Sequence, residues 1–488
     1  MIELDARLTE GQKAPLGTEN GLAHNNTLSD PLNDPLNDPL DPEATVTVVR
    51  PWVWILGLIV LAVALASGWV RDLEARLDSG FNQPPQVVES QLTPTGLTDA
   101  LAVSLRSPWP LAKKDLAALM SPKVLERPDP GLVEFTDLSG RRLFAETTLD
   151  ATLQKQAQGW LKRTRAQKAA LVVLNPFEGE VLVLASHGAA EGHNAAVSEV
   201  FPAASLFKIV TAAAAIETAD YEVESEVAYD GGKHTLYKAN VTKDPGVGRR
   251  KATLKEGFAE SNNAVFGKVG AFDVGQKELA DYAQRFHFNR PFDFELPVAL
   301  SSFPRQDPED LYRAAELASG FNRQTKTTAL HGATLAAAVL ANGELKEPYL
   351  LREVFDEDNN IFYRSQPKSL GQPINPATAS ELKELMEAAV EMGTGRRRFA
   401  DIADHPLLSG LVIGGKTGTI NNDEGLRVEW FVAYSYWPDP EVGPVWPLAL
   451  SAVVVSEGRA ALDSQALIRQ ALIAYYQPLL DGSLRVYR

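Results

Sequence analysis

The chain has 488 residues, of which 45% are hydrophobic and 23% are charged, a globular composition with room for more than one folded unit. Its formal net charge of −16 argues against nucleic acid as a partner, because binding phosphates requires clustered lysine and arginine. The absence of cysteine excludes disulfides, thiolate catalysis and cysteine-type zinc sites. The seven histidines are scattered without the HExxH spacing, so we expect no metal and no other cofactor.

The N-terminal region predicts a tail followed by a membrane anchor. Residues 1–49 are polar and repeat the string Asp-Pro-Leu-Asn, which predicts a disordered tail. The stretch from Pro51 to Val70 contains no charge and has tryptophans near its edges, which predicts a transmembrane helix over residues 50–71. A cleavable signal peptide is the alternative, but the acidic stretch before it is unlike a short basic n-region. Arginines flank both sides, so charge does not orient the anchor.

The remaining chain predicts a stalk and a larger α+β domain. Residues 72–145 alternate proline-rich pieces with short helices and are expected to form a stalk or small pedestal. Residues 146–488 begin with a hairpin and end with three strands, and helices lie between them. We therefore expect an antiparallel sheet closed by both ends of the domain, together with a helical subdomain. The expected strands are 169–174, 180–185, 411–416, 428–434 and 448–455.

A candidate nucleophile lies near the start of the apolar helical run from Ala203 to Ala219. Ser205 and Lys208 are three residues apart, and therefore share one face of a buried helix. Desolvation disfavours an ammonium, so Lys208 is expected to be partly neutral near pH 7 and able to take a proton from Ser205. The SxxK string is not unique, because it recurs at Ser365 in a loop and at Ser380 at the start of an exposed helix.

Two further motifs follow in order. Ser261-Asn262-Asn263 is the only SxN string, 56 residues after Ser205 and within an apolar helical stretch. Lys416-Thr417-Gly418-Thr419 contains the only KTG string, 153 residues after Asn263 and at the end of a strand. Either string alone is compatible with an ordinary bend or turn. Neither Ser365 nor Ser380 is followed by an SxN string, so the order selects Ser205.

This ordered triplet resembles that of the penicillin-recognising serine acyltransferases, whose motifs are SxxK, SxN and KTG. From about residue 146 to 480 the sequence is similar to the transpeptidase domain of high-molecular-mass penicillin-binding proteins. One departure is Ala203-Ala204, where many relatives have a glycine just before the serine, and we expect it to be harmless.

The resemblance implies an acyl-enzyme mechanism on peptidoglycan stem peptides. Ser205 would attack the carbonyl between the two terminal D-alanines, with Lys208 as the general base. Ser261 would relay protons toward the leaving amine, Lys416 would tune its environment, and Asn263 would hold the substrate backbone.

The third motif would bind the substrate. Thr417 and Thr419, with Lys416, would hold the terminal carboxylate, and Gly418 would let the substrate approach the strand. The oxyanion hole would be the backbone N–H groups of Ser205 and Thr419. An amine of a second stem peptide would take the acyl group, whereas a β-lactam would acylate Ser205 and remain.

Several rival functions share parts of these patterns. The stretch from Gly410 to Thr417 satisfies the P-loop pattern, but its middle is Leu-Val-Ile and no helix is expected to begin at the lysine, so an ATPase is rejected. A β-lactamase would need a deacylating base, and no ExxLN motif of the class A type is found. A D,D-carboxypeptidase, a non-hydrolytic penicillin sensor and a catalytically silent scaffold of the wall-synthesis complex remain alternatives.

The expected cellular setting follows from the substrate. Stem peptides lie outside the cytoplasmic membrane, so we expect the tail inside and residues 72–488 outside a bacterial inner membrane, held in its lipid by one helix. The interval between anchor and catalytic domain is too short for a glycosyltransferase, which predicts a monofunctional enzyme. A separate membrane-embedded glycan polymerase is a candidate partner.

Overall fold

The computed structural model describes residues 110–480, apart from residues 127–129, 242–245, 306, 308, 403 and 407. All described residues belong to one unit spanning Leu92–Arg488. The tail expected over residues 1–49 and the anchor expected over residues 50–71 lie outside the described residues. Among the helices that are described, none is long and apolar enough to cross a membrane.

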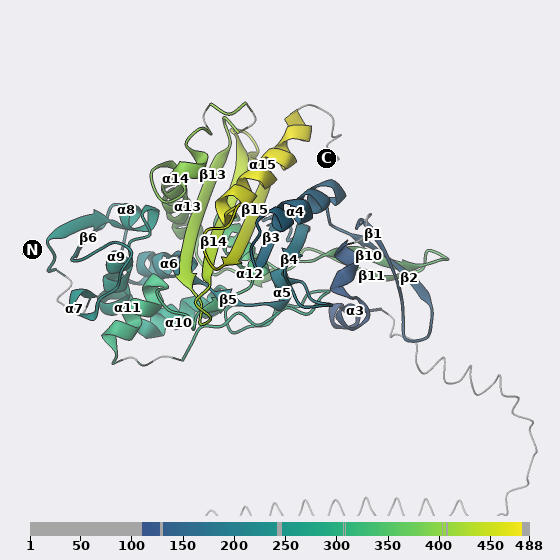
Figure 1. Ribbon diagram of the computed structural model, residues 1–488, viewed down its shortest axis with the longest axis horizontal. Coiled ribbons are helices and arrows are strands. Elements are labelled where there is room, and N and C mark those ends of the chain that lie inside the picture. Colours follow the sequence, from purple (N-terminus) through teal and green to yellow (C-terminus); the bar gives the residue numbers. More distant parts are fainter. Residues whose placement is uncertain are drawn as a thin grey trace, which may run out of the picture. The chain divides into compact units, whose positions relative to one another are not determined.

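The centre of this unit is a five-stranded antiparallel sheet in the order β13-β14-β15-β3-β4 (Figure 1). The first hairpin of the domain and its last three strands therefore lie side by side, as expected from the sequence. Strand β13 is an edge strand, and its outer side is open to the helical part of the domain. The strands are β3 (Lys168–Leu174), β4 (Val181–His187), β13 (Val412–Asn421), β14 (Arg427–Asp439) and β15 (Gly443–Ser456).

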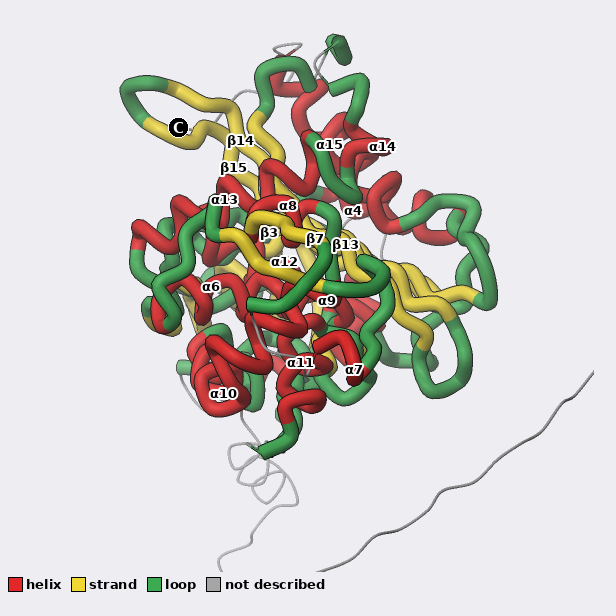
Figure 2. Tube along the Cα trace, turned by 90° about the vertical axis from the view of Figure 1, so that its left-hand side faces the viewer, coloured by secondary structure: helices red, strands yellow, loops and turns green. Residues whose placement is uncertain are grey.

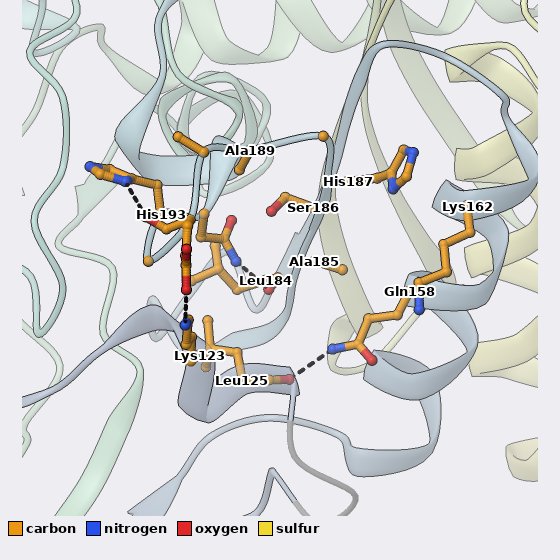
Figure 3. Close-up of a pocket in the computed structure, with 15 residues that line it drawn as sticks. Lys123, Leu125, Gln158, Lys162, Leu184, Ala185, Ser186, His187, Ala189 and His193 are labelled. Atoms are coloured by element: carbon orange, nitrogen blue, oxygen red, sulfur yellow. Dashed lines mark hydrogen bonds and ion pairs between the residues drawn. The ribbon is translucent and has the colours of Figure 1, made fainter.

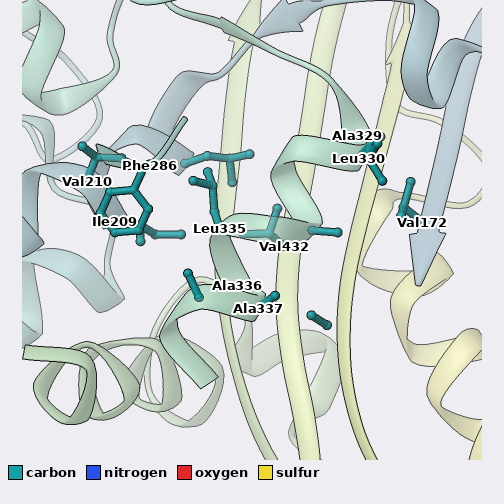
Figure 4. Packing of buried hydrophobic residues seen from close by; sticks show 14 of the residues in the cluster. Val172, Ile209, Val210, Phe286, Ala329, Leu330, Leu335, Ala336, Ala337 and Val432 are labelled. Carbon is teal, nitrogen blue, oxygen red and sulfur yellow. The ribbon is translucent and has the colours of Figure 1, made fainter. Parts of the chain in front are cut away.

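Both faces of the sheet are covered, which explains why its strands are almost continuously apolar. On one face, alternate residues such as Leu171 and Phe431 pack with helices α4 and α15. On the other face, Val172 and Val432 pack against α12, and Figure 4 shows α12 between these strands and the residues Ile209 and Phe286. The covering helices are α4 (Ala151–Arg163), α12 (Ala329–Leu340) and α15 (Ser464–Leu480).

Helix α12 packs closely on the sheet because its side chains are small. Every residue from Ala329 to Leu340 is buried, and six of these twelve residues are alanine or glycine. A Cβ atom added at Gly332 would lie 2.6 Å from the Ser451 hydroxyl oxygen of β15. A helix that is apolar on nearly every face is expected to lie in the core, and α12 does so.

Helices gather beside the β13 edge, and Figure 2 views the molecule from this side. Two short antiparallel strand pairs, β5 with β8 and β6 with β7, belong to the same part of the domain. The helices are η2 (Ala204–Phe207), α6 (Lys208–Thr218), α7 (Lys238–Val241), α8 (Leu254–Ala259), α9 (Asn263–Lys268), the π-helix η3 (Val269–Val274), α10 (Gly275–Arg285), α11 (Leu311–Ser319), α13 (Pro376–Glu391) and α14 (Arg396–Phe399). The short strands are β5 (Phe201–Pro202), β6 (Glu226–Tyr229), β7 (Arg250–Thr253) and β8 (Lys326–Thr327).

A second, four-stranded sheet in the order β1-β2-β10-β11 lies at the other end, beyond β4 in Figure 1. Strand β2 pairs with β10, so residues from the expected stalk and from the middle of the chain share one sheet. The elements here are α3 (Lys113–Leu119), η1 (Pro122–Glu126), β1 (Leu132–Thr136), β2 (Arg142–Thr147), β10 (Leu351–Asp356) and β11 (Ile361–Arg364). The remaining elements are α5 (Ala195–Ser198), β9 (Leu345–Lys346) and β12 (Ser369–Gly371).

Three local expectations near the motifs are corrected by the structure. The helix expected from Ala203 begins as the 3₁₀ turn η2 and becomes α-helical only at Lys208. The apolar stretch containing the SxN string is two helices rather than one, because Ser261 has a φ of 55° and ends the first helix. The KTG string does not end a strand, since β13 continues through it to Asn421.

Candidate active site

The turn that carries Ser205 is held by hydrogen bonds from two other segments. Ala203 donates its N–H to the Thr325 carbonyl at 2.9 Å, and the Trp430 indole donates to the Pro202 carbonyl at 2.8 Å. Ala204 has a φ of 48°, a strained conformation for a residue with a Cβ atom, and it directly precedes the serine. The backbone is therefore strained directly before the candidate nucleophile, because alanine is less stable than glycine in this conformation.

Lys208 is fully buried directly below Ser205. Its Nζ lies 2.8 Å from Ser205 Oγ, 2.7 Å from Asn263 Oδ1 and 2.6 Å from the Ser319 carbonyl oxygen. Burial, together with the nearby Lys416 charge, lowers the pKa of Lys208 well below that of a free lysine. A neutral amine has two N–H donors and one lone pair. These match the amide oxygen, the carbonyl oxygen and the hydroxyl of Ser205, which can donate to Nζ.

The SxN turn places two polar side chains in the same cleft. Asn262 caps α9, because its Oδ1 accepts from the N–H groups of Ala264 and Val265. This capping leaves Asn263 as the first helical residue, with its side chain on Lys208. Ser261 precedes the cap, and its Oγ lies 2.9 Å from Lys416 Nζ.

Lys416 is the second buried lysine of the site, and it projects from β13. Its ammonium group donates to Ser261 Oγ and to the Thr417 carbonyl, and it lies 5.3 Å from the centre of the Phe258 ring. Burial lowers the pKa of Lys416 to about 7. Each buried lysine is therefore paired with one serine, Lys208 with Ser205 and Lys416 with Ser261.

Strand β13 lies close to the nucleophile turn at Gly418. A Cβ atom at this position would lie 3.4 Å from the Ala203 carbonyl oxygen and 3.3 Å from the Trp430 Cβ atom. The flanking residues Thr417 and Thr419 line a cleft of about 400 Å³ together with Ser205, Ser261 and Asn263. The structure thus brings all eight predicted site residues together, with both lysines buried beneath the cleft and Gly418 between the two threonines that line it.

The structure adds residues that the motifs do not include. Thr394 lines the cleft, and its hydroxyl oxygen lies 2.6 Å from that of Thr417. His234 also lines it, and burial and the three nearby lysines together lower the pKa of His234. Gly320 has a φ of 70°, and a Cβ atom there would lie 1.9 Å from the Ala204 carbonyl oxygen. The string Gly-Thr-Gly at residues 393–395 is the one signal that marked a tight turn near Thr394.

A separate cavity of about 370 Å³ lies among η1, α4 and the β4–α5 loop (Figure 3). Lys123, His187 and His193 line it, and Lys123 forms an ion pair with Glu191 at 2.8 Å. None of the residues lining this cavity belongs to the three motifs. We therefore place the candidate chemistry in the cleft at Ser205.

Known proteins share this sequence pattern and fold. The chain is 26% identical over 278 residues to peptidoglycan D,D-transpeptidase PbpA of Mycolicibacterium smegmatis, a match covering 56% of this chain and 53% of that protein. It is 25% identical over 396 residues to the protein of the same name from Mycobacterium tuberculosis, covering 70% of this chain and 76% of the relative. The chain thus spans about half the length of the first relative.

Solved structures agree on the fold. Penicillin-binding protein A from M. tuberculosis, in a penicillin G acyl-enzyme complex, superimposes with a TM-score of 0.52 at 22% identity, covering 68% of this chain and 80% of that one. The two proteins therefore share a mixed α/β fold with antiparallel sheets. The sequence profile of the penicillin-binding protein transpeptidase domain matches residues 169–448, which is more than half of the chain. The chain therefore belongs to the penicillin-binding protein transpeptidase domain family.

Proposed function

We propose that this protein is a serine D,D-transpeptidase that cross-links peptidoglycan stem peptides through an acyl-enzyme at Ser205. The observation that carries the proposal is the contact between Ser205 Oγ and the buried amine of Lys208, 2.8 Å apart at the floor of an open cleft. Membership of the family supports it, as does the similarity to peptidoglycan D,D-transpeptidase PbpA.

In the first half-reaction, Ser205 Oγ attacks the carbonyl between the terminal D-alanines while Lys208 Nζ takes its proton. The tetrahedral oxyanion accepts hydrogen bonds from the backbone N–H groups of Ser205 and Thr419. The C–N bond breaks, and the departing D-alanine receives a proton through Ser261, whose hydroxyl is hydrogen-bonded to Lys416. Asn263 orients both Lys208 and the substrate backbone.

In the second half-reaction, the amine of another stem peptide attacks the ester carbonyl. A new amide bond forms, the bond to Ser205 Oγ breaks, and the serine recovers its proton. The hydroxyl groups of Thr417 and Thr419, beside Lys416, donate hydrogen bonds to the carboxylate of the departing D-alanine. They bind the carboxylate next to the entering amine in the same way. A β-lactam acylates the same serine, and the penicillin G acyl-enzyme of a structural neighbour supports this part of the proposal.

Covalent labelling by a fluorescent penicillin tests the acyl-enzyme. We expect the wild type to be labelled and Ser205→Ala to lose all labelling. Ser380→Ala is the matched control, because Ser380 begins another SxxK string but lies exposed on α13, and it should label like the wild type. An unlabelled wild type would overturn the proposal and leave the silent scaffold as the alternative.

An acceptor assay separates the transpeptidase from a D,D-carboxypeptidase or a penicillin sensor. With a donor pentapeptide and an added acceptor amine, a transpeptidase forms the cross-linked dimer. Release of D-alanine without any dimer would indicate a carboxypeptidase, and neither product would indicate a sensor.

We further propose that the enzyme is monofunctional and anchored in the bacterial inner membrane, with residues 72–488 outside the cytoplasm. The uncharged stretch from Pro51 to Val70 supports this part of the proposal. A reporter fused to the C-terminus should be active only outside the cytoplasm, and activity inside would contradict the orientation. A membrane-embedded glycan polymerase should co-purify as a partner, and its absence from the purified complex would count against that partnership.

A further inference from the structure

A second hollow adjoins the candidate catalytic cleft. It has a volume of about 660 Å³ and lies between the β13–β14 hairpin, α14 and the N-terminal end of α15. Thr394 and Arg427 line both this hollow and the cleft at Ser205, so the two adjoin. We call the hollow the arginine groove, after the arginines that line it: Arg397, Arg398, Arg427 and Arg459.

Two of these arginines are free to bind a ligand. Arg398 is paired with Asp463, and Arg427 with Glu429 at 2.7 Å. Arg397 and Arg459 are exposed, and within the part of the chain that the structure describes neither has an ion-pair partner. Guanidinium groups bind carboxylates with two parallel hydrogen bonds, so two unpaired arginines in one groove suit a ligand with carboxylates.

The same groove contains unused acceptors. Glu429 Oε2 and Gln465 Oε1 are buried, and no described residue provides either with a hydrogen-bond partner. Buried acceptors are normally satisfied, because leaving one unpaired costs free energy. Neither atom is accessible from the groove, so the exposed guanidinium groups of Arg397 and Arg459 are the groups that a peptide carrying carboxylates can contact.

The reaction requires such a peptide on this side of the cleft. The entering amine must attack the ester carbonyl from the place that the departing D-alanine has left, because both amines bond to the same carbon atom. The carboxylate of that D-alanine is assigned to Thr417, whose hydroxyl is 2.6 Å from that of Thr394. Thr394 is where the arginine groove begins, so a peptide with its amine at the acyl carbon can continue into the groove.

We infer that the arginine groove binds the acceptor stem peptide, with Arg397 and Arg459 holding its carboxylates. The inference rests on the proposed function, since it assigns a subsite of that reaction. It makes Arg397 and Arg459 determinants of acceptor specificity.

Direct binding to the full-length chain tests the inference without requiring turnover. The probes are the synthetic tripeptides L-Ala-γ-D-Glu-L-Lys and L-Ala-γ-D-Glu-meso-diaminopimelate. Both lack D-Ala-D-Ala and so cannot act as donors. We expect Arg397→Gln/Arg459→Gln to raise the dissociation constant by about tenfold or more, since hydrogen bonds between charged groups are lost. Tripeptides with their carboxylates converted to carboxamides should bind the wild type as weakly as the acids bind the double variant.

Arg396→Gln is the matched control, because Arg396 belongs to the same arginine run but does not line the groove. It should bind both tripeptides like the wild type, and all variants should keep the wild-type rate of penicillin labelling, which reports folding. Equal affinity of the wild type and the double variant, equal loss in Arg396→Gln, or no binding of either tripeptide to the wild type would overturn the inference. Failure of the proposed function has a different signature, the absence of Ser205-dependent labelling in the same preparation.

Discussion

At the scale of single residues, the proposed chemistry depends on a lysine that is kept neutral. Lys208 contacts an amide oxygen, a carbonyl oxygen and a hydroxyl, but no carboxylate of the described residues. Burial is the main cause of its lowered pKa, and the charge of Lys416 adds to it. A negative charge at any of these contacts would stabilise the ammonium and remove the general base.

Asn263→Asp places such a charge 2.7 Å from Lys208 Nζ. The carboxylate should raise the pKa of Lys208, so acylation by penicillin at pH 7 should fall by up to about 100-fold, the limit for a shift of about two pKa units. Because a base with a raised pKa becomes neutral only at higher pH, the rate should recover as pH rises. The pH dependence of the acylation rate measures this. Asn263→Ala removes the hydrogen bond without adding charge, and an equal alkaline shift in that variant would contradict the electrostatic explanation.

At the scale of elements, the nucleophile turn is positioned by backbone contacts between segments. The end of α11 reaches the turn at Gly320, and the edge strand β13 reaches it at Gly418. Both approaches are closer than most side chains allow, which explains why glycine is found at both positions. The geometry of Ser205 should therefore be sensitive to a single added methyl group in a neighbouring element.

Gly320→Ala tests this packing. The new Cβ atom would meet the Ala204 carbonyl oxygen at 1.9 Å, and relieving that overlap must displace the residue before Ser205. We expect the free energy of unfolding to fall by about 2–3 kcal/mol and acylation by penicillin to slow by about 100-fold. Gly140→Ala is the control, because Gly140 also has a positive φ of 83° but has no atom near its added Cβ. It should lose about 1 kcal/mol and acylate normally, and similar acylation by both variants would rule out the packing explanation.

At the scale of the whole molecule, the site lowers the stability of the fold. Lys416 is fully buried on a sheet whose other positions are mostly apolar, and its neutral form is favoured by burial. In the unfolded chain the same side chain keeps its proton up to a pKa of 10.5. Between these two pKa values the unfolded chain binds more protons than the folded chain, so this residue makes stability rise with pH.

Lys416→Met removes the titrating group while keeping a long apolar side chain. Relative to this variant, the wild type should become progressively less stable as pH falls from about 10.5 to about 7, and the difference should level off below pH 7. Urea unfolding at several pH values measures it. Lys155→Met, at an exposed position on α4, should show no such trend. If the difference in free energy of unfolding between wild type and Lys416→Met does not vary with pH, Lys416 has the same pKa in the folded and the unfolded chain, and the prediction is wrong.

The sequence alone determined the architecture of the sheet and the identity of the candidate nucleophile. The hairpin of residues 169–185 and the strands near the C-terminus are recognisable because strand pairing and burial leave local apolar runs. Ser205 was distinguished from Ser365 and Ser380 by the order of the three motifs, which is a property of the sequence. Boundaries at the motifs were less accurate, because the left-handed backbone at Ala204 and Ser261 has no local signal.

Only the tertiary structure decided how these groups act together. The contacts of Lys208 join residues 55 and 111 positions apart, and the contact of Lys416 with Ser261 spans 155 positions. Burial of both lysines, the place of Thr394 beside Thr417, and the position of the arginine groove next to the cleft all depend on such packing. A sequence pattern records which side chains are available, whereas pKa values and binding surfaces depend on what surrounds those side chains in the folded chain.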